Sequence, residues 1–149
     1  MSFRQLLSLV RSHDPVVEAP AEDSWDGFER DQRALPVDYK MYISTFGSGV
    51  LADFFWIWNP FSRHASINWG IMKDQTLQSY SRIRSQVPEF FHQWKLYPER
   101  GGLLPCGHTM NGDSIFWRTD GLPEQWTIAV GREADLDVYC GNLCAFPRP

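Results

Sequence analysis

The sequence of 149 residues has no long apolar run, and its acids outnumber its bases. No stretch approaches the roughly 18 consecutive apolar residues of a membrane-spanning helix. Residues 1–10 carry one base and an apolar stretch that Gln5 and Ser8 interrupt, unlike a secretory leader. With 14 Lys and Arg against 18 Asp and Glu, the formal net charge is −4, so the basic surface that nucleic-acid binding needs is not expected. We therefore expect a cytoplasmic protein that contacts neither membranes nor nucleic acid directly.

Cysteine is scarce, and the common catalytic signatures are missing. Three cysteines, an odd number, do not build a disulfide framework. The metal-like residues are Cys106, His108, Cys140 and Cys144. Their spacing differs from the tight pairs of structural zinc sites, so we expect no metal and no cofactor, with a zinc site as the alternative. The chain contains no Gly-Lys dipeptide, no Gly-x-Gly-x-x-Gly and no His-x-Glu, which argues against the usual phosphate-binding loops and against a zinc deaminase. These absences predict a protein that is not an enzyme, although residues far apart in sequence can still converge in a fold.

Aromatic side chains, by contrast, are abundant. Aromatic residues make up 15% of the chain and hydrophobic residues 43%, with seven Trp and ten Phe. Disordered chains are poor in such residues, and the length suits one domain with a single core. We therefore expect one domain over residues 1–149, with its core at about residues 25–145 and an N-terminal helix and acidic loop at residues 1–34.

The acids are unevenly placed along the chain. Seven of them lie between Asp14 and Asp31 against one base, and a second cluster lies near the C-terminus at Glu133, Asp135 and Asp137. An acidic patch on a small protein can steer a basic partner and raise the association rate. The alternative is a solvated loop that serves only solubility. The sequence leaves both interpretations open.

Three helices are predicted, at residues 2–12, 36–46 and 71–87. In the first, apolar residues recur at helical spacing. In the second, Pro36 suits the first helical turn and Gly47 suits the C-terminal cap. The residues expected to face inward from the third helix are Leu77, Tyr80, Ile83 and Val87. The Pro-rich stretch from Asp14 to Asp31 is expected to be a loop that Trp25 and Phe28 hold against the body.

Short runs of β-forming residues predict a sheet. They lie at residues 50–52, 54–58, 103–106, 114–118, 126–130 and 138–140. Asn111-Gly112 is a strong hairpin signal because both positions tolerate positive φ. The order of elements predicts an α+β fold, with helices packed on one face of a largely antiparallel sheet.

Two groups of motifs carry a family resemblance. The first is Leu35-Pro36-Val37-Asp38-Tyr39 followed by Gly47-Ser48-Gly49, and the second is the apolar strand, Asn-Gly-Asp turn and aromatic strands from Leu103 to Val130. In their order and spacing these motifs resemble the SUKH superfamily over residues 25–145. The family commonly ends with a helix after the last strand, whereas Pro147 and Pro149 prevent a helix that starts at Gly141 from continuing. The C-terminus therefore departs from the family pattern.

The resemblance implies a binding protein. Bacterial members of the superfamily are immunity proteins that each block a toxin, often a nuclease or a nucleic-acid deaminase, and fungal members regulate cell-wall synthesis through protein contacts. We expect a non-catalytic immunity protein whose partner is a cognate protein toxin. The alternative is a regulatory interaction module in a cell-wall or other assembly without a toxin. A small hydrolase is a third class, and it would need a pocket with perturbed titratable groups.

Candidate partner-binding residues combine aromatic anchors with acids. Alternation along residues 54–58 places Phe54, Trp56 and Trp58 on one face, which either anchors a partner or is buried in a central strand. Asp113 either completes a hairpin turn or also contacts a basic partner. The predicted contact residues are Glu22, Asp23, Trp25, Asp26, Asp53, Trp56, Trp58 and Asp113.

Overall fold

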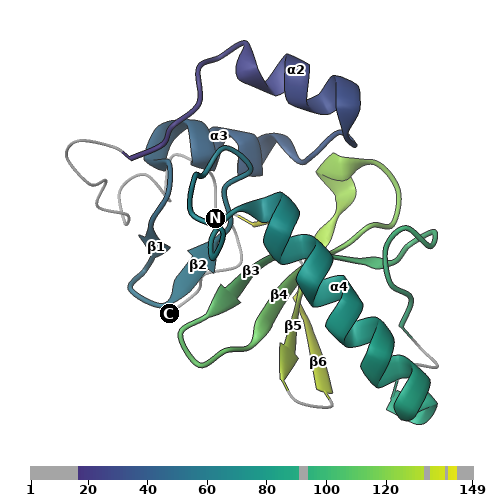
Figure 1. The fold of residues 1–149 in the computed structure, drawn as a ribbon. Coiled ribbons are helices and arrows are strands. Elements are labelled where there is room, and N and C mark those ends of the chain that lie inside the picture. The colour runs from purple at the N-terminus through teal and green to yellow at the C-terminus, as the bar shows by residue number, and fades with distance from the viewer. Residues whose placement is uncertain (1–16, 91–93, 133–134, 140, 144–149) are drawn as a thin grey trace.

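The computed structural model describes residues 17–90, 94–132, 135–139 and 141–143. The predicted helix at residues 2–12 lies outside these residues, as do Glu133, Cys140, Cys144 and the C-terminal prolines. Within them the structure has three α-helices, α2 (Ser24–Asp31), α3 (Val37–Phe46) and α4 (Trp69–Gln86), and two short 3-10 helices, η1 (Pro88–Phe90) and η2 (Pro123–Gln125) (Figure 1). None of these helices is both long and apolar enough to cross a membrane.

In the part of the chain that the structure describes, six strands form one antiparallel meander. They are β1 (Val50–Leu51), β2 (Phe55–Ile57), β3 (Leu103–Thr109), β4 (Ser114–Arg118), β5 (Thr127–Arg132) and β6 (Asp135–Tyr139), and each pairs with the next along the chain. The predicted turn at Asn111-Gly112 joins β3 to β4, where Gly112 has φ +86° and the Thr109 N–H donates to the Asp113 carbonyl. The predicted α+β fold with an antiparallel sheet is confirmed.

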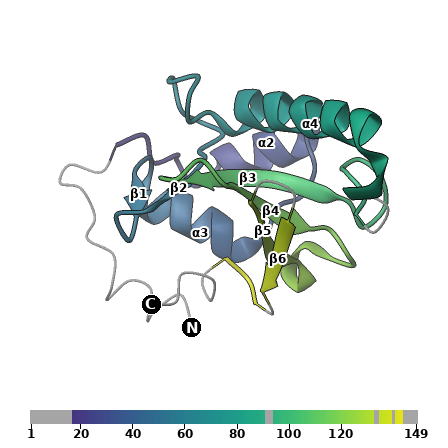
Figure 2. The same cartoon turned by 90° about the horizontal axis from the view of Figure 1, so that it is seen from below.

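The helices lie on both faces of this sheet. Neighbouring residues of a strand point to opposite faces, and in β4 Phe116 contacts Tyr80 of α4 while Trp117 contacts Tyr39 of α3. Accordingly the buried residues fall into two clusters, a large one around Trp117 and a small one around Phe116. Figure 2 shows α4 above the sheet and α3 below it. The predicted packing of the helices on one face is not confirmed.

Helix α3 follows the prediction closely. Its buried residues are Tyr39, Tyr42, Ile43 and Phe46. Pro36 precedes the first turn, and the helix ends at Gly47, whose φ of +63° is one that L side chains rarely adopt. The next backbone N–H, that of Ser48, donates to the Val17 carbonyl. The chain on the N-terminal side of α2 is thereby fixed against the C-terminal end of α3.

Two expectations about helices are wrong. Residues 24–31 form α2 and are not a loop, because Trp25 and Phe28, three residues apart, share one helix face and pack against Phe61. Ile83 of α4 is 40% exposed and does not face inward. The residue one helical turn after Tyr80 on the inner side of α4 is Arg84. Its guanidinium pairs with the Glu99 carboxylate at 2.6 Å.

Candidate functional site

The predicted contact residues fall into two separate groups. One group lies where the β1–β2 turn meets the β3–β4 hairpin, and the other lies on α2 and the residues just before it. Figure 1 shows α2 at the opposite side of the molecule from the β1–β2 turn. We name the first group, together with two neighbours that the fold brings to it, the sheet-end surface; its residues are Asp53, Trp56, His108, Met110 and Asp113.

The sheet-end surface is built on one stacked pair of rings and an adjacent thioether. Trp56 in β2 lies directly opposite His108 in β3, and their rings stack at a centroid distance of 6.2 Å with planes 18° apart. The Trp56 indole N–H donates to the Met110 sulfur at 3.2 Å. Trp56 is only partly buried, and Met110 is 59% exposed at the tip of the hairpin. A partner can therefore reach an aromatic and a thioether side chain that are already held in place.

Trp58 lies beneath this pair of rings and contacts His108. It is only 1% exposed, and its indole N–H donates to Nδ1 of His108 at 2.8 Å. The prediction that Trp58 contacts a partner is wrong, because the side chain belongs to the core. Since Nδ1 of His108 accepts this hydrogen bond, the proton of the neutral imidazole sits on Nε2. Burial lowers the pKa of His108 and so favours this neutral form.

Asp53 occupies a tight turn between β1 and β2. Ala52 and Asp53 have φ of +52° and +54°, and the Phe54 N–H donates to the Leu51 carbonyl at 3.2 Å. Two consecutive residues with positive φ define the type I′ turn, which matches the twist of paired strands. Asp53 is exposed, and the turn that carries it lies beside the hairpin tip, because the Met110 N–H donates to the carbonyl of the next residue, Phe54.

Asp113 has a structural role within the β3–β4 hairpin. Its backbone N–H donates to Oγ1 of Thr109 at 3.2 Å, and its carboxylate lies 3.3 Å from the same hydroxyl. These bonds agree with the interpretation of Asn111-Gly112-Asp113 as a hairpin turn. The carboxylate is partly buried, so it adds negative charge to the sheet-end surface from a fixed position.

On α2 the structure separates the acids from the aromatic anchor. Glu22, Asp23 and Asp26 are exposed, whereas Trp25 is 7% exposed and donates its indole N–H to Oγ of Ser44 at 2.8 Å. Its ring packs edge-on against Phe61 at 4.9 Å. Trp25 is therefore a core residue along most of its surface. The three acids are exposed, and their contact with a partner stays a prediction.

The part of the chain that the structure describes has no metal-binding site and no reactive thiol. No group of three or more His, Cys, Asp and Glu is placed to hold an ion among those residues. Cys106 is fully buried, and burial together with the nearby Asp38 raises its pKa, so it stays an unreactive thiol at neutral pH.

Sequence reasoning did not predict that His108 and Met110 belong to this surface, and it considered His108 only as a metal-like residue. The predicted strand ended at Cys106, whereas β3 continues to Thr109. The available signal was Asn111-Gly112, because a hairpin turn at these residues requires strands that stay paired up to the loop. In the structure the loop is Met110-Asn111-Gly112, closed by the Thr109 N–H bond to the Asp113 carbonyl, which places Met110 at the tip. No family model, no curated protein and no solved structure matches the chain. The resemblance to the SUKH superfamily therefore stays a prediction.

Proposed function

We propose that this protein is a non-catalytic immunity protein that binds a cognate toxin and blocks it stoichiometrically. Two lines support the proposal: the sequence resemblance to SUKH immunity proteins, and the sheet-end surface. The observation that carries it is the partly exposed Trp56, fixed between His108 and Met110 and flanked by Asp53. Binding energy at protein interfaces is concentrated in Trp, Tyr and Arg side chains near the centre of the contact.

The geometry favours binding without rearrangement. Stacking on His108 and the hydrogen bond to Met110 fix the Trp56 ring before a partner arrives. A preformed anchor loses little side-chain entropy on binding, so more of the contact energy appears as affinity. In the bound state, the protein would cover the surface through which the toxin acts on its target.

The distribution of acids suits a toxin that acts on nucleic acid. A nuclease or a nucleic-acid deaminase needs a basic surface to hold phosphates. Glu22, Asp23 and Asp26 are exposed on the same protein that carries Asp53 at the sheet end. These acids would steer such a basic surface toward the immunity protein during the encounter.

The test begins with capture of the partner. Tagged full-length protein is used to isolate binding proteins from its native lysate, and each is identified by mass spectrometry. Recovery of one stoichiometric partner that has a toxin domain and kills cells when expressed alone supports the proposal, provided that co-expression of this protein restores growth. Recovery of a broad assembly without a toxin would favour the regulatory module instead.

A variant then tests the surface. Trp56→Ala should weaken toxin binding at least ~10-fold, because loss of an interface anchor costs about 2 kcal/mol or more. Leu122→Ala is the matched control, since Leu122 is 67% exposed and lies outside the sheet-end surface. Asp53→Asn removes the charge but retains a residue that tolerates positive φ. Full rescue by both Trp56→Ala and Asp53→Asn, with unchanged affinity, would remove this surface from the contact.

A further inference from the structure

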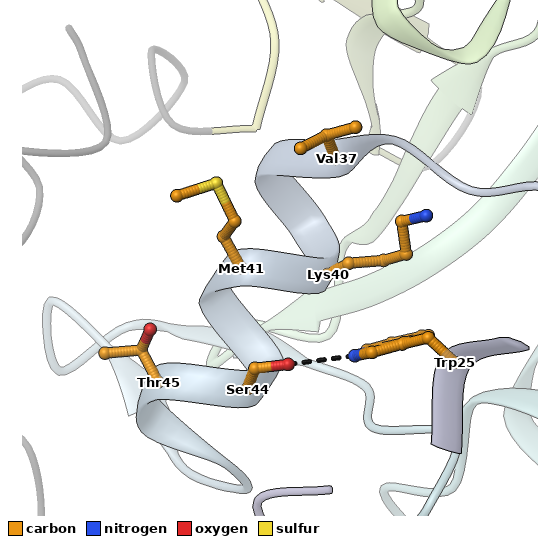
Figure 3. A pocket seen from close by; sticks show the side chains of 6 residues that line it. All are labelled: Trp25, Val37, Lys40, Met41, Ser44 and Thr45. Atoms are coloured by element: carbon orange, nitrogen blue, oxygen red, sulfur yellow. Dashed lines mark hydrogen bonds between the residues drawn. The ribbon is translucent and has the colours of Figure 1, made fainter. Parts of the chain in front are cut away.

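Helix α3 exposes an apolar stripe that the core does not use. Val37 is 47% exposed and Met41, one turn later, is 43% exposed, while the opposite side of the same helix is fully buried. Together with Trp25 of α2, this stripe lines a shallow, open hollow of about 280 Å³, which we name the α3 hollow. Its lining residues are Trp25, Val37, Lys40, Met41, Ser44 and Thr45 (Figure 3).

The polar groups around the α3 hollow are already paired within the protein. The Trp25 indole N–H donates to Ser44 (Figure 3), and the Lys40 ammonium pairs with Glu29 of α2 at 2.6 Å. These two bonds hold Trp25 and Lys40 in place and leave the apolar side chains of Val37 and Met41 exposed along the hollow. Methionine is adaptable and is common on surfaces that bind helices of varied sequence. The hollow is therefore suited to apolar side chains and poorly suited to a polar small molecule.

The charge around the hollow selects among possible occupants. Residues 17–48, which form α2, α3 and their flanks, contain seven acids and three bases. Glu22, Asp23 and Asp26 are exposed just before and within α2, whose Trp25 forms one wall of the hollow. A second copy of the chain would bring two such acidic regions together, which is unfavourable, and nucleic acid would be repelled for the same reason. A basic partner is attracted.

The dimensions of the stripe define the shape of the partner segment. Val37, Met41 and Thr45 recur every four residues, and a helix of 10 residues such as α3 is about 15 Å long. An amphipathic helix recognises such a surface through apolar side chains one turn apart, at positions i, i+3 or i+4, and i+7. A hollow of about 280 Å³ has room for only a few side chains, and it lies below the usual range of drug-sized ligand pockets.

We infer that the α3 hollow docks an amphipathic, basic helix of a partner protein. Its apolar side chains pack over Val37 and Met41, and its Lys or Arg residues lie toward the exposed acids Glu22 and Asp26. The inference goes beyond the proposed function, because it concerns a second surface and holds for a basic partner whether or not that partner is a toxin.

The test uses a defined probe and the full chain. The probe is a fluorescently labelled synthetic peptide of about four helical turns with Leu at positions i, i+4 and i+7 and Lys on the flanking positions, and binding is followed by fluorescence anisotropy. The expected result is saturable binding that Met41→Gln weakens at least ~10-fold, which is a typical loss for an interface anchor. Ile83→Gln is the matched control, since Ile83 is a similarly exposed apolar residue on α4, and it should leave binding unchanged. A peptide with Glu in place of Lys should bind at least ~10-fold more weakly.

Several outcomes would overturn the inference. Absence of saturation at about 1 mM peptide, or equal loss in Met41→Gln and Ile83→Gln, would show that the hollow is no specific site. Self-association of the wild type that Met41→Gln abolishes would assign the hollow to a second copy. If the Leu7→Asp variant bound the peptide and the wild type did not, residues 2–12 of the same chain would be the occupant of the hollow. Because no toxin is involved, failure here leaves the proposed immunity function standing, and failure of the rescue assay leaves this inference standing.

Discussion

His108 connects the buried core to the sheet-end surface through a single imidazole ring. Its Nδ1 accepts the Trp58 indole N–H, and its face stacks on Trp56. Protonation of Nδ1 would break the bond to Trp58, so one proton would disturb the position of Trp56. The position of Trp56 in the sheet-end surface is thus coupled to the charge state of His108.

The stability of the protein should depend on pH through His108. Burial lowers the pKa of this residue below its usual 6.5 in the folded state. The unfolded chain then binds a proton more readily, so the free energy of unfolding falls as the pH drops from 6.5 toward the lower folded pKa. His108→Gln, whose amide oxygen can still accept from Trp58, should make urea denaturation less dependent on pH between 7 and 5. Parallel curves for the variant and the wild type would contradict this role.

The Glu18 side chain links the residues before α2 to two loops. The backbone of Glu18 is strained. Its φ is +59°, unusual for this residue type, and its carboxylate accepts hydrogen bonds from the Ser48 and Ser62 hydroxyls and from the Arg63 N–H. Burial by itself would raise the pKa of Glu18, but the three hydrogen bonds outweigh it and lower that pKa below 4.5. The ionised carboxylate is therefore part of the folded structure.

Glu18→Gln should lower the free energy of unfolding at pH 7 by about 1–3 kcal/mol, because a carboxylate acceptor of several hydrogen bonds is lost. The stabilisation by a carboxylate with a lowered pKa is fully present above its unfolded pKa and disappears as the pH falls through its folded pKa. The difference between variant and wild type should therefore close in acid. Glu22→Gln, at an exposed position four residues along, is the control and should change stability by less than about 0.5 kcal/mol. A constant difference from pH 7 to pH 3 would show that the charge of Glu18 is not the cause.

At the scale of elements, the end of α3 depends on one glycine. Gly47 has φ +63°, and an added Cβ would overlap the Val17 carbonyl, which accepts the Ser48 N–H. Gly47→Ala should therefore cost at least about 2 kcal/mol, from backbone strain and from displacement of the chain before α2. Gly112→Ala is a matched control, because its φ is +86° but no atom lies within 4 Å of the added Cβ. It should cost only about 1 kcal/mol of strain, and equal losses in chemical denaturation would contradict the role of the Val17 contact.

The sequence predicted elements well where a local signal and burial agree. Helix α3 has a proline before its first turn, buried residues at helical spacing and a glycine at its end, and the β3–β4 hairpin has Asn111-Gly112. The β1–β2 turn was not predicted as a turn, because Ala52-Asp53 carries no glycine and its positive φ is imposed by the pairing of two strands. Helix α2 was missed because its stability comes from packing of Trp25 and Phe28 on distant rings rather than from helix propensity.

For the molecule as a whole, the separation of the acidic α2 from the sheet-end surface predicts how binding responds to charge. At low ionic strength, reversal of Glu22, Asp23 and Asp26 to Lys should slow association with a basic toxin and leave the dissociation rate nearly unchanged, since these exposed acids lie away from the sheet-end surface and act only through the long-range field during the encounter. Added salt should slow the wild type and reduce this difference, because screening shortens the range of the attraction. Stopped-flow kinetics measures both rates.

The control for this prediction carries the same change in net charge elsewhere. Asp74→Lys, Asp120→Lys and Glu124→Lys lie at exposed positions outside α2. If this triple variant slows association as much as the α2 variant, net charge alone governs the encounter and the position of the acids does not matter.

By itself the sequence determined the composition of the core, the predicted ends of α3, the β3–β4 hairpin and the uneven distribution of acids. These follow from local periodicity, from residues with restricted backbone angles and from charge, all of which the chain carries before it folds. Only the tertiary structure decided which tryptophans are accessible. Trp56 and Trp58 have the same sequence signal, yet one stacks on His108 at the surface and the other lies beneath it in the core. The pairing of β2 with β3 joins residues about fifty positions apart, and the burial of a side chain depends on what such distant partners place over it.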